Sequence, residues 1–176
     1  GLAIQLDGKI VLAGYSHNGT NEDVALVRYN TDGSLDTGFD SDGKRTVAIG
    51  AGYDVAKAVA IQTDGKIVVA GDSLVGATPD FTLLRFNTNG SLDTSFGSSG
   101  KVWTNASGLD IMTLCYGVTL QGDGKIVLAG APVATQPASS SASSTSTSAP
   151  TSSKSVTKDG ELRGRLRSWV KGLLEE

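Results

Sequence analysis

The chain has 176 residues and a formal net charge of −3 at pH 7, and 23 of its residues are glycine. This length allows one ordinary domain with an appendage. Glycine at well above its average share of roughly 7% favours a turn-rich chain over a helical bundle. No apolar run approaches the ~18–20 residues that a membrane-spanning helix needs, which excludes such a span. One cysteine excludes an internal disulfide framework and any multi-cysteine metal site.

Three segments of the chain differ in composition. Residues 1–131 hold 20 of the 23 glycines and a net charge of −5, and no nucleic-acid partner is expected because such a surface needs clustered positive charge. Residues 132–158 are almost wholly Ser, Thr, Ala and Pro, which predicts a disordered linker. Residues 159–176 have a helical apolar period. The predicted domains are therefore a repeat array, a linker and a C-terminal helix.

The first segment repeats itself. The block Gln-x-Asp-Gly-Lys-Ile-Val-x-Ala-Gly begins at Gln5, Gln62 and Gln121. A second block, Arg-Tyr/Phe-Asn-x-Asp/Asn-Gly-Ser-Leu-Asp-x-x-Phe, begins at Arg28 and returns at Arg85. The repeat length is 57 and then 59 residues, so the chain holds two whole repeats and the first hairpin of a third.

Each repeat predicts four strands. In the second copy these are expected over about 55–62, 66–72, 80–87 and 101–105. Asp64-Gly65 predicts a two-residue hairpin with positive φ at both residues. Two finer features are a stripe of alanines on one side of the first strand (Ala56, Ala58 and Ala60) and one helical turn over 91–96, capped by Ser91.

Four antiparallel strands that are covered on both faces and repeat every 57–59 residues favour a β-propeller blade. A β-helix coil would need a far shorter period, and a sandwich would not repeat in sequence. The predicted fold class is all-β, with two and a half propeller-type blades, the linker and one amphipathic helix.

The two repeated blocks, over residues 1–131, resemble the delta-60 repeat family of bacterial, mostly secreted or surface proteins. This resemblance implies a propeller-like fold and a secreted or cell-surface location, and it carries over no catalytic activity or cofactor. Family members usually have more repeats. The chain also starts inside a strand, because Leu2-Ala3-Ile4-Gln5 aligns with Val59-Ala60-Ile61-Gln62, and this start without Met favours a processed or incomplete chain.

Two and a half blades cannot close a ring, because propellers have about four to eight. The open ends should expose strand edges and apolar faces. Three explanations remain open: the chain is a fragment of a longer one, copies associate, or a protein partner covers the faces.

One turn has the oxygen pattern of a calcium loop, with side chains at alternate positions around a glycine: Asn30, Asp32, Ser34 and Asp36. Asn89 replaces Asp32 in the second copy, and the terminal glutamate is missing from both. An Asx-type turn is therefore favoured over calcium, and no other cofactor is expected.

Arg28 and Arg85 lie in apolar strands, eight residues before Asp36 and Asp93. We expect each pair to be an ion pair that fastens the long turn to the strand, with substrate recognition as the alternative. Residues that break the repeat could form a partner surface or reflect ordinary loop variation: Tyr15, His17, Tyr53, Trp103 and 109–116. Cys115 has no obvious His or Asp partner for a nucleophile, and for His17, in a Gly/Asn-rich loop, a solvated side chain is favoured over a base.

The C-terminal helix is predicted to have one apolar face, flanked by Arg163 and Arg167. The apolar face comprises Leu162, Leu166, Trp169, Val170, Leu173 and Leu174. Gly164 and Gly172 make the helix marginal in isolation. It could dock on its own blades, lie on an anionic membrane surface, or bind a partner protein as a tethered peptide, and the last is favoured.

These features predict a non-enzymatic structural or adhesive module of a larger assembly, with the helix as its docking element. The alternative is an adhesin-like propeller that binds carbohydrate or another surface ligand. An enzyme is the least favoured interpretation, because no acid–base constellation lies outside the repeated turns.

Overall fold

A computed structural model describes residues 1–104 and 112–133. The chain divides into two units, Gly1–Pro137 and Ala138–Glu176. The linker and C-terminal helix predicted above lie outside the described residues. Within the described part of the chain, no helix is long and apolar enough to cross a membrane.

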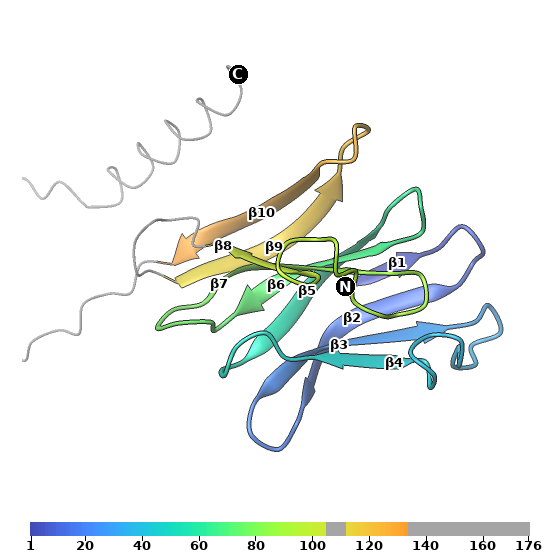
Figure 1. Ribbon diagram of the computed structural model, residues 1–176, viewed down its shortest axis with the longest axis horizontal. Helices are drawn as coiled ribbons and strands as arrows, with labels where there is room; N and C mark the ends of the chain where they lie inside the picture. The colour runs from blue at the N-terminus through green and yellow to red at the C-terminus, as the bar shows by residue number, and fades with distance from the viewer. Residues whose placement is uncertain (105–111, 134–176) are drawn as a thin grey trace, which may run out of the picture. The chain divides into compact units, whose positions relative to one another are not determined.

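The described residues form three antiparallel sheets (Figure 1). The first sheet has the strands β1 (Leu2–Ile4), β2 (Ile10–His17), β3 (Glu22–Tyr29) and β4 (Lys44–Val47). The second has β5 (Asp54–Ile61), β6 (Ile67–Ser73), β7 (Asp80–Phe86) and β8 (Lys101–Thr104). The third is the hairpin of β9 (Met112–Leu120) and β10 (Ile126–Val133). The all-β architecture and the four-stranded antiparallel sheets are confirmed.

The first two sheets share one register as well as one strand order. Leu12 of β2 pairs with Val27 of β3, and the residues 57 positions later, Val69 and Leu84, pair in the same way. Each strand position of the first sheet therefore has a structural counterpart on the second. This equivalence allows their surroundings to be compared residue by residue.

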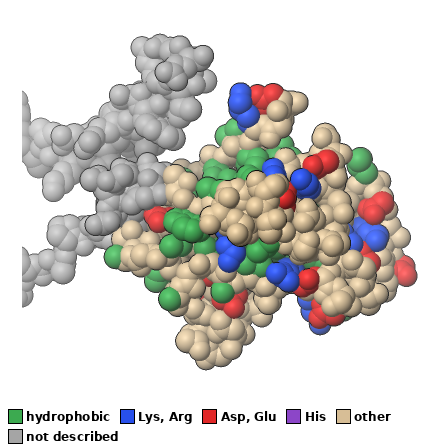
Figure 2. Space-filling model, viewed as in Figure 1, with side chains coloured by type: hydrophobic (Ala, Val, Ile, Leu, Met, Phe, Trp, Pro, Cys, Tyr) green, Lys and Arg blue, Asp and Glu red, His purple; other side chains and the backbone are tan. Residues whose placement is uncertain are grey.

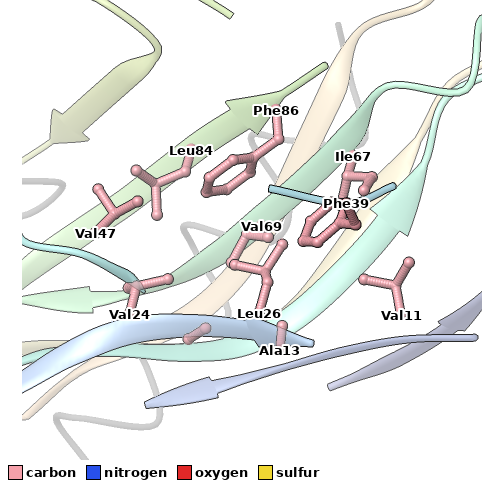
Figure 3. Close-up of a cluster of buried hydrophobic side chains, with 11 residues drawn as sticks. Val11, Ala13, Val24, Leu26, Phe39, Val47, Ile67, Val69, Leu84 and Phe86 are labelled. Carbon is pink, nitrogen blue, oxygen red and sulfur yellow. The ribbon is translucent and has the colours of Figure 1, made fainter. Parts of the chain in front are cut away.

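The apolar core lies between the first and second sheets (Figure 3). The first sheet and its long turn contribute Val11, Ala13, Val24, Leu26, Phe39 and Val47. The second contributes Ala56, Ile67, Val69, Leu84 and Phe86. Every residue of β6 is buried, as its continuous apolar run predicted, because both faces of its sheet are covered.

The third sheet covers the opposite face of the second. The backbone N–H of Cys115 in β9 donates to Asp72 Oδ1 in β6 at 2.5 Å. Gly130 of β10 lies so close to the Phe81 ring that a Cβ there would be 2.4 Å from the ring. A glycine at this position therefore allows the two sheets to approach.

The hairpin turns differ from the two-residue form that the sequence predicted. Gly8, Gly65 and Gly124 have positive φ, but the aspartates before them do not. Gly8 N–H donates to Gln5 O at 2.9 Å, and Gln5 N–H donates to Lys9 O at 2.8 Å. The connection is thus a type I turn followed by a glycine in the left-handed region, a longer loop that also suits the strand twist.

Two further expectations were wrong. Residues 91–96 form no helix: Leu92 makes a β-bridge to Phe86, and Ser91 Oγ donates to Asn89 Oδ1 at 2.8 Å instead of capping a helical turn. A β-bulge between Ala56 and Ala58 breaks the alanine stripe. Ala56 faces the core against the first sheet, whereas Ala58 pairs with Ala70 on the other side of the bulge.

The contact between sheets should dominate stability. Leu26 is fully buried in the core, whereas Leu6 is fully exposed in the first hairpin turn. We expect Leu26→Ala to lower the free energy of unfolding by about 2–5 kcal/mol. Leu6→Ala should change it by less than about 0.5 kcal/mol. Urea unfolding measures both, and similar effects of the two substitutions would contradict the assigned core.

The turn geometry makes a second prediction. Gly8 has a φ of 82°, and a Cβ there would lie 2.8 Å from Thr31 Cγ2. Gly14, within β2, has free space at the same position. Gly8→Ala should therefore lower the thermal midpoint clearly, because of left-handed strain and a clash. Gly14→Ala is the matched control and should leave the midpoint nearly unchanged; equal losses would show that the turn assignment is wrong.

Candidate functional site

A buried ion cluster fastens the long turn of the first sheet to β3. Arg28 Nε lies 2.7 Å from Asp36 Oδ2, and Lys9 Nζ lies 2.8 Å from the same oxygen. The Arg28 guanidinium also lies over the Phe39 ring, 4.7 Å from its centroid. The predicted ion pair between Arg28 and Asp36 is confirmed, and Lys9 is a third member that the sequence analysis missed.

The second sheet repeats this cluster. Arg85 Nε lies 2.8 Å from Asp93 Oδ2, Lys66 Nζ lies 3.0 Å from it, and Arg85 lies over the Phe96 ring. Asp93 also accepts bonds from the backbone N–H and the hydroxyl of Ser95. Because both copies contain the same interactions, their first role is to hold the turn in place.

The two clusters differ in the groups that the arginine contacts outside the cluster. Arg28 Nη1 reaches the second sheet and donates to the backbone oxygen of Thr88 at 2.5 Å. The backbone N–H of Asp40 makes a parallel link to Asn89 O at 2.9 Å. The Arg85 side chain is 20% exposed, against 8% for Arg28, and its Nη2 donates only within its own turn, to Ser95 at 3.4 Å. The Arg28 cluster therefore also joins the first sheet to the second.

The four calcium candidates take part in a hydrogen-bonded turn. Asp32 Oδ1 accepts from the backbone N–H of Ser34 at 2.9 Å and from its hydroxyl at 2.6 Å. Asn30 Nδ2 donates to Ser34 Oγ at 3.0 Å, and Asp36 is held by Arg28 and Lys9. These are the bonds of the Asx-type turn. In the described residues, no group of three or more His, Cys, Asp or Glu side chains is arranged to hold a metal ion.

A cavity of about 510 Å³ lies between the turns of the two sheets. Its walls include Gln5 and Lys9 from the first hairpin, Arg28 from β3, and Gln62 and Thr88 from the second sheet. Leu6, Asp7 and Ile61 also line the cavity, and the two cations in its wall already pair with Asp36. Lysine and arginine lie beside aspartate and glutamate on the face shown in Figure 2, without a patch of one sign.

Cys115 and His17, the only cysteine and the only histidine of the chain, belong to different sheets. Cys115 is 1% exposed, and burial raises the pKa of its thiol, which disfavours the reactive thiolate. His17 Nδ1 lies 3.7 Å from Glu22 at the exposed end of the β2–β3 hairpin. Among the other non-repeating residues, Tyr15, Trp103 and Tyr116 are exposed aromatics.

The outer face of the first sheet is open. This open face consists of Leu2, Ile4, Ile10, Leu12, Val27 and Tyr29. Its most exposed members are Ile4 at 65% and Leu2 at 62%, and Leu12 is 36% exposed. On the second sheet, the counterpart of Leu12 is Val69, which is 1% exposed because the first sheet packs on it. The sequence predicted that the array has open faces. The strand pairing in the structure shows which residues form this one.

The repeats match a known family. Residues 5–39 and 62–96 match the family described as "Domain of unknown function (DUF5122) beta-propeller". The chain carries β-propeller-type repeats. Each matched segment runs from the first hairpin turn through the third strand to the phenylalanine of the ion cluster, and we call each sheet a blade from here on. No curated protein matches the chain.

The ion cluster predicts how stability depends on pH. Hydrogen bonds from Ser95 and Lys66 hold the pKa of Asp93 well below its usual range, and Lys9 lowers the pKa of Asp36. A carboxyl with a lower pKa in the folded state stabilises the fold above its unfolded pKa of about 3.9, and this stability is lost as the pH falls through the folded pKa. We expect the free energy of unfolding to fall below about pH 4.

The Asp93→Asn variant should lose less stability than the wild type when the pH falls from neutral into this acid range. Asp36→Asn should behave in the same way, because both substitutions remove a group that must take up a proton. Urea unfolding at a series of pH values measures the effect. Parallel pH profiles of wild type and both variants would contradict the assigned role of the cluster.

Proposed function

We propose that the chain is a non-enzymatic structural or adhesive module of a larger assembly, and that its C-terminal helix is the docking element. The observation that supports this most directly is the open face. Six apolar positions that are covered in the second blade have no covering sheet in the first blade among the residues that the structure describes. A face of this kind is typical of an interaction surface.

The repeated clusters support a structural role. In each copy, a lysine and an arginine pair with one aspartate and hold the long turn to the strand, with nearly the same distances in both copies. A ligand site needs one copy, whereas packing needs every copy. The repeats thus form a scaffold, and we assign the recognition of a specific partner to the residues that do not repeat.

The docking role of the helix rests on its sequence. In a helix over this segment, Leu162, Leu166, Trp169, Val170 and Leu173 would share one face, with Arg163 and Arg167 beside it. The linker, residues 132–158, has an expected r.m.s. span of roughly 30 Å, which lets the helix reach a neighbouring protein. We place the protein at the surface of a bacterium or outside it, in line with the repeats it resembles.

The test is a photo-cross-linking amino acid at position 169 of the full chain, in the cells that produce it. We expect a cross-linked protein partner, and we expect Leu166→Asp to reduce its yield at least roughly tenfold, because a charge enters the apolar face. Ser168→Asp, on the opposite side of the helix, is the control and should leave the yield unchanged. Cross-links to lipid alone, to the chain's own blades, or to nothing would contradict the proposal.

A second candidate is carbohydrate binding, which the exposed aromatic side chains favour. Trp103 is 44% exposed and Tyr116 is 66% exposed, and neither belongs to the repeated blocks. A glycan screen of the full chain tests this candidate. It requires a hit that Trp103→Ala removes, and a screen without hits would exclude it.

A further inference from the structure

The two ends of the described array carry the two complementary halves of one interface. The first half is the open face of the first blade. Its counterparts on the second blade, including Ile67, Val69 and Leu84, are at most 1% exposed because the first blade packs on them. Since the pairing register is the same in both blades, the open face has the shape of a surface that receives another blade.

The second half lies on the third blade. In the first blade, Val11 and Ala13 of β2 cover the second blade and are at most 6% exposed. The repeat places Val127 and Ala129 of β10 at the same two positions. Both are exposed, Val127 to 41%, and Thr119 is paired with Val127 on the neighbouring strand. We call Val127, Ala129 and Thr119 the hairpin face.

We propose that the open face of the first blade binds the hairpin face of a second copy of this chain. The proposal rests on the proposed role in an assembly and names one partner. The contact continues the interface that already joins the first and second blades, with apolar groups on both sides and no like charges at these positions. A second copy supplies the missing half at each end, so two copies form two equal contacts.

Such a head-to-tail contact either closes a ring or grows into a filament. The described residues of two copies provide six blade positions, four with four strands and two with a hairpin. This number falls within the roughly four to eight blades of known propellers, so the pair can close. The expected species is a dimer with twice the 18.0 kDa mass of one chain.

The test is the native mass of the full chain and of three variants, measured by light scattering or analytical ultracentrifugation. Ile4→Asp places a charge on the open face, and Val127→Asp places one on the hairpin face. Each should raise the dimer dissociation constant by roughly tenfold or more, since a carboxylate that loses water in the contact without a charged partner costs well over 1.4 kcal/mol. Thr20→Asp adds the same charge in an exposed loop and should leave the dimer intact.

Mixing the two variants separates the head-to-tail contact from other arrangements. Ile4→Asp keeps its hairpin face and Val127→Asp keeps its open face, so at a concentration where each alone is mostly monomeric a mixture should form a heterodimer through one intact contact. The heterodimer also shows that both variants are folded. A monomeric wild type, or a dimer that Val127→Asp leaves unchanged, would overturn the proposal.

One more variant tests whether the chain's own C-terminal segment, residues 159–176, covers the open face. If deletion of residues 159–176 converts a monomer into a dimer, the helix covers the face and the proposal is wrong. If the wild type is a dimer and the deletion leaves it so, the second copy is the occupant. Cross-linking from position 169 is independent of the Ile4→Asp result, so failure of the helix role and failure of this dimer are distinguishable.

Discussion

The packing of one sheet face on the next is the interaction on which the rest of this structure depends. A four-stranded antiparallel sheet cannot bury its two apolar faces by itself, because each face needs another layer. The second blade meets this need on both sides, and every residue of its strand β6 is buried. The first blade meets it on one side only. Stability, the open face and the association proposed above all follow from this one requirement.

The repeated ion clusters make that packing possible. The turn between the third and fourth strands is long, and without an anchor it could not hold Phe39 in the core between the blades. Arg28 and Lys9 fix Asp36 in the middle of this turn, and Phe39 N–H donates to Asp36 O at 2.9 Å. Buried charges are costly unless they are paired. Their pairing here places an aromatic ring where the next blade needs it, so electrostatics and packing act on the same residues.

Much of the fold could be predicted from the sequence because repetition shows which features are needed every time. The strands of the second repeat lie within about two residues of their expected bounds. The pairing of Arg28 with Asp36 was predictable because an isolated charge in an apolar strand needs a partner, and the same spacing recurs at Arg85. The match to a β-propeller family rests on the same two blocks.

The remaining features depend on interactions that local patterns do not contain. Asp-Gly fits both a two-residue hairpin and a type I turn with a following glycine, and the bond between Gln5 and Lys9 decides between them. Ser91 resembles a helix cap, but the β-bridge between Leu92 and Phe86 holds the chain in an extended conformation at this point. Alternation shows that a strand has two faces without showing which one meets the next blade. For this reason the members of the open face could not be named in advance.

The central claim is that consecutive blades share one core and are therefore stabilised together. Hydrogen exchange of the Leu26→Ala variant tests this claim most directly, because Leu26 lies in β3 and shares its core cluster with residues of the second blade. If the account is right, amides of β6 and β7 lose protection together with those of β2 and β3. Loss of protection confined to the first blade would contradict it.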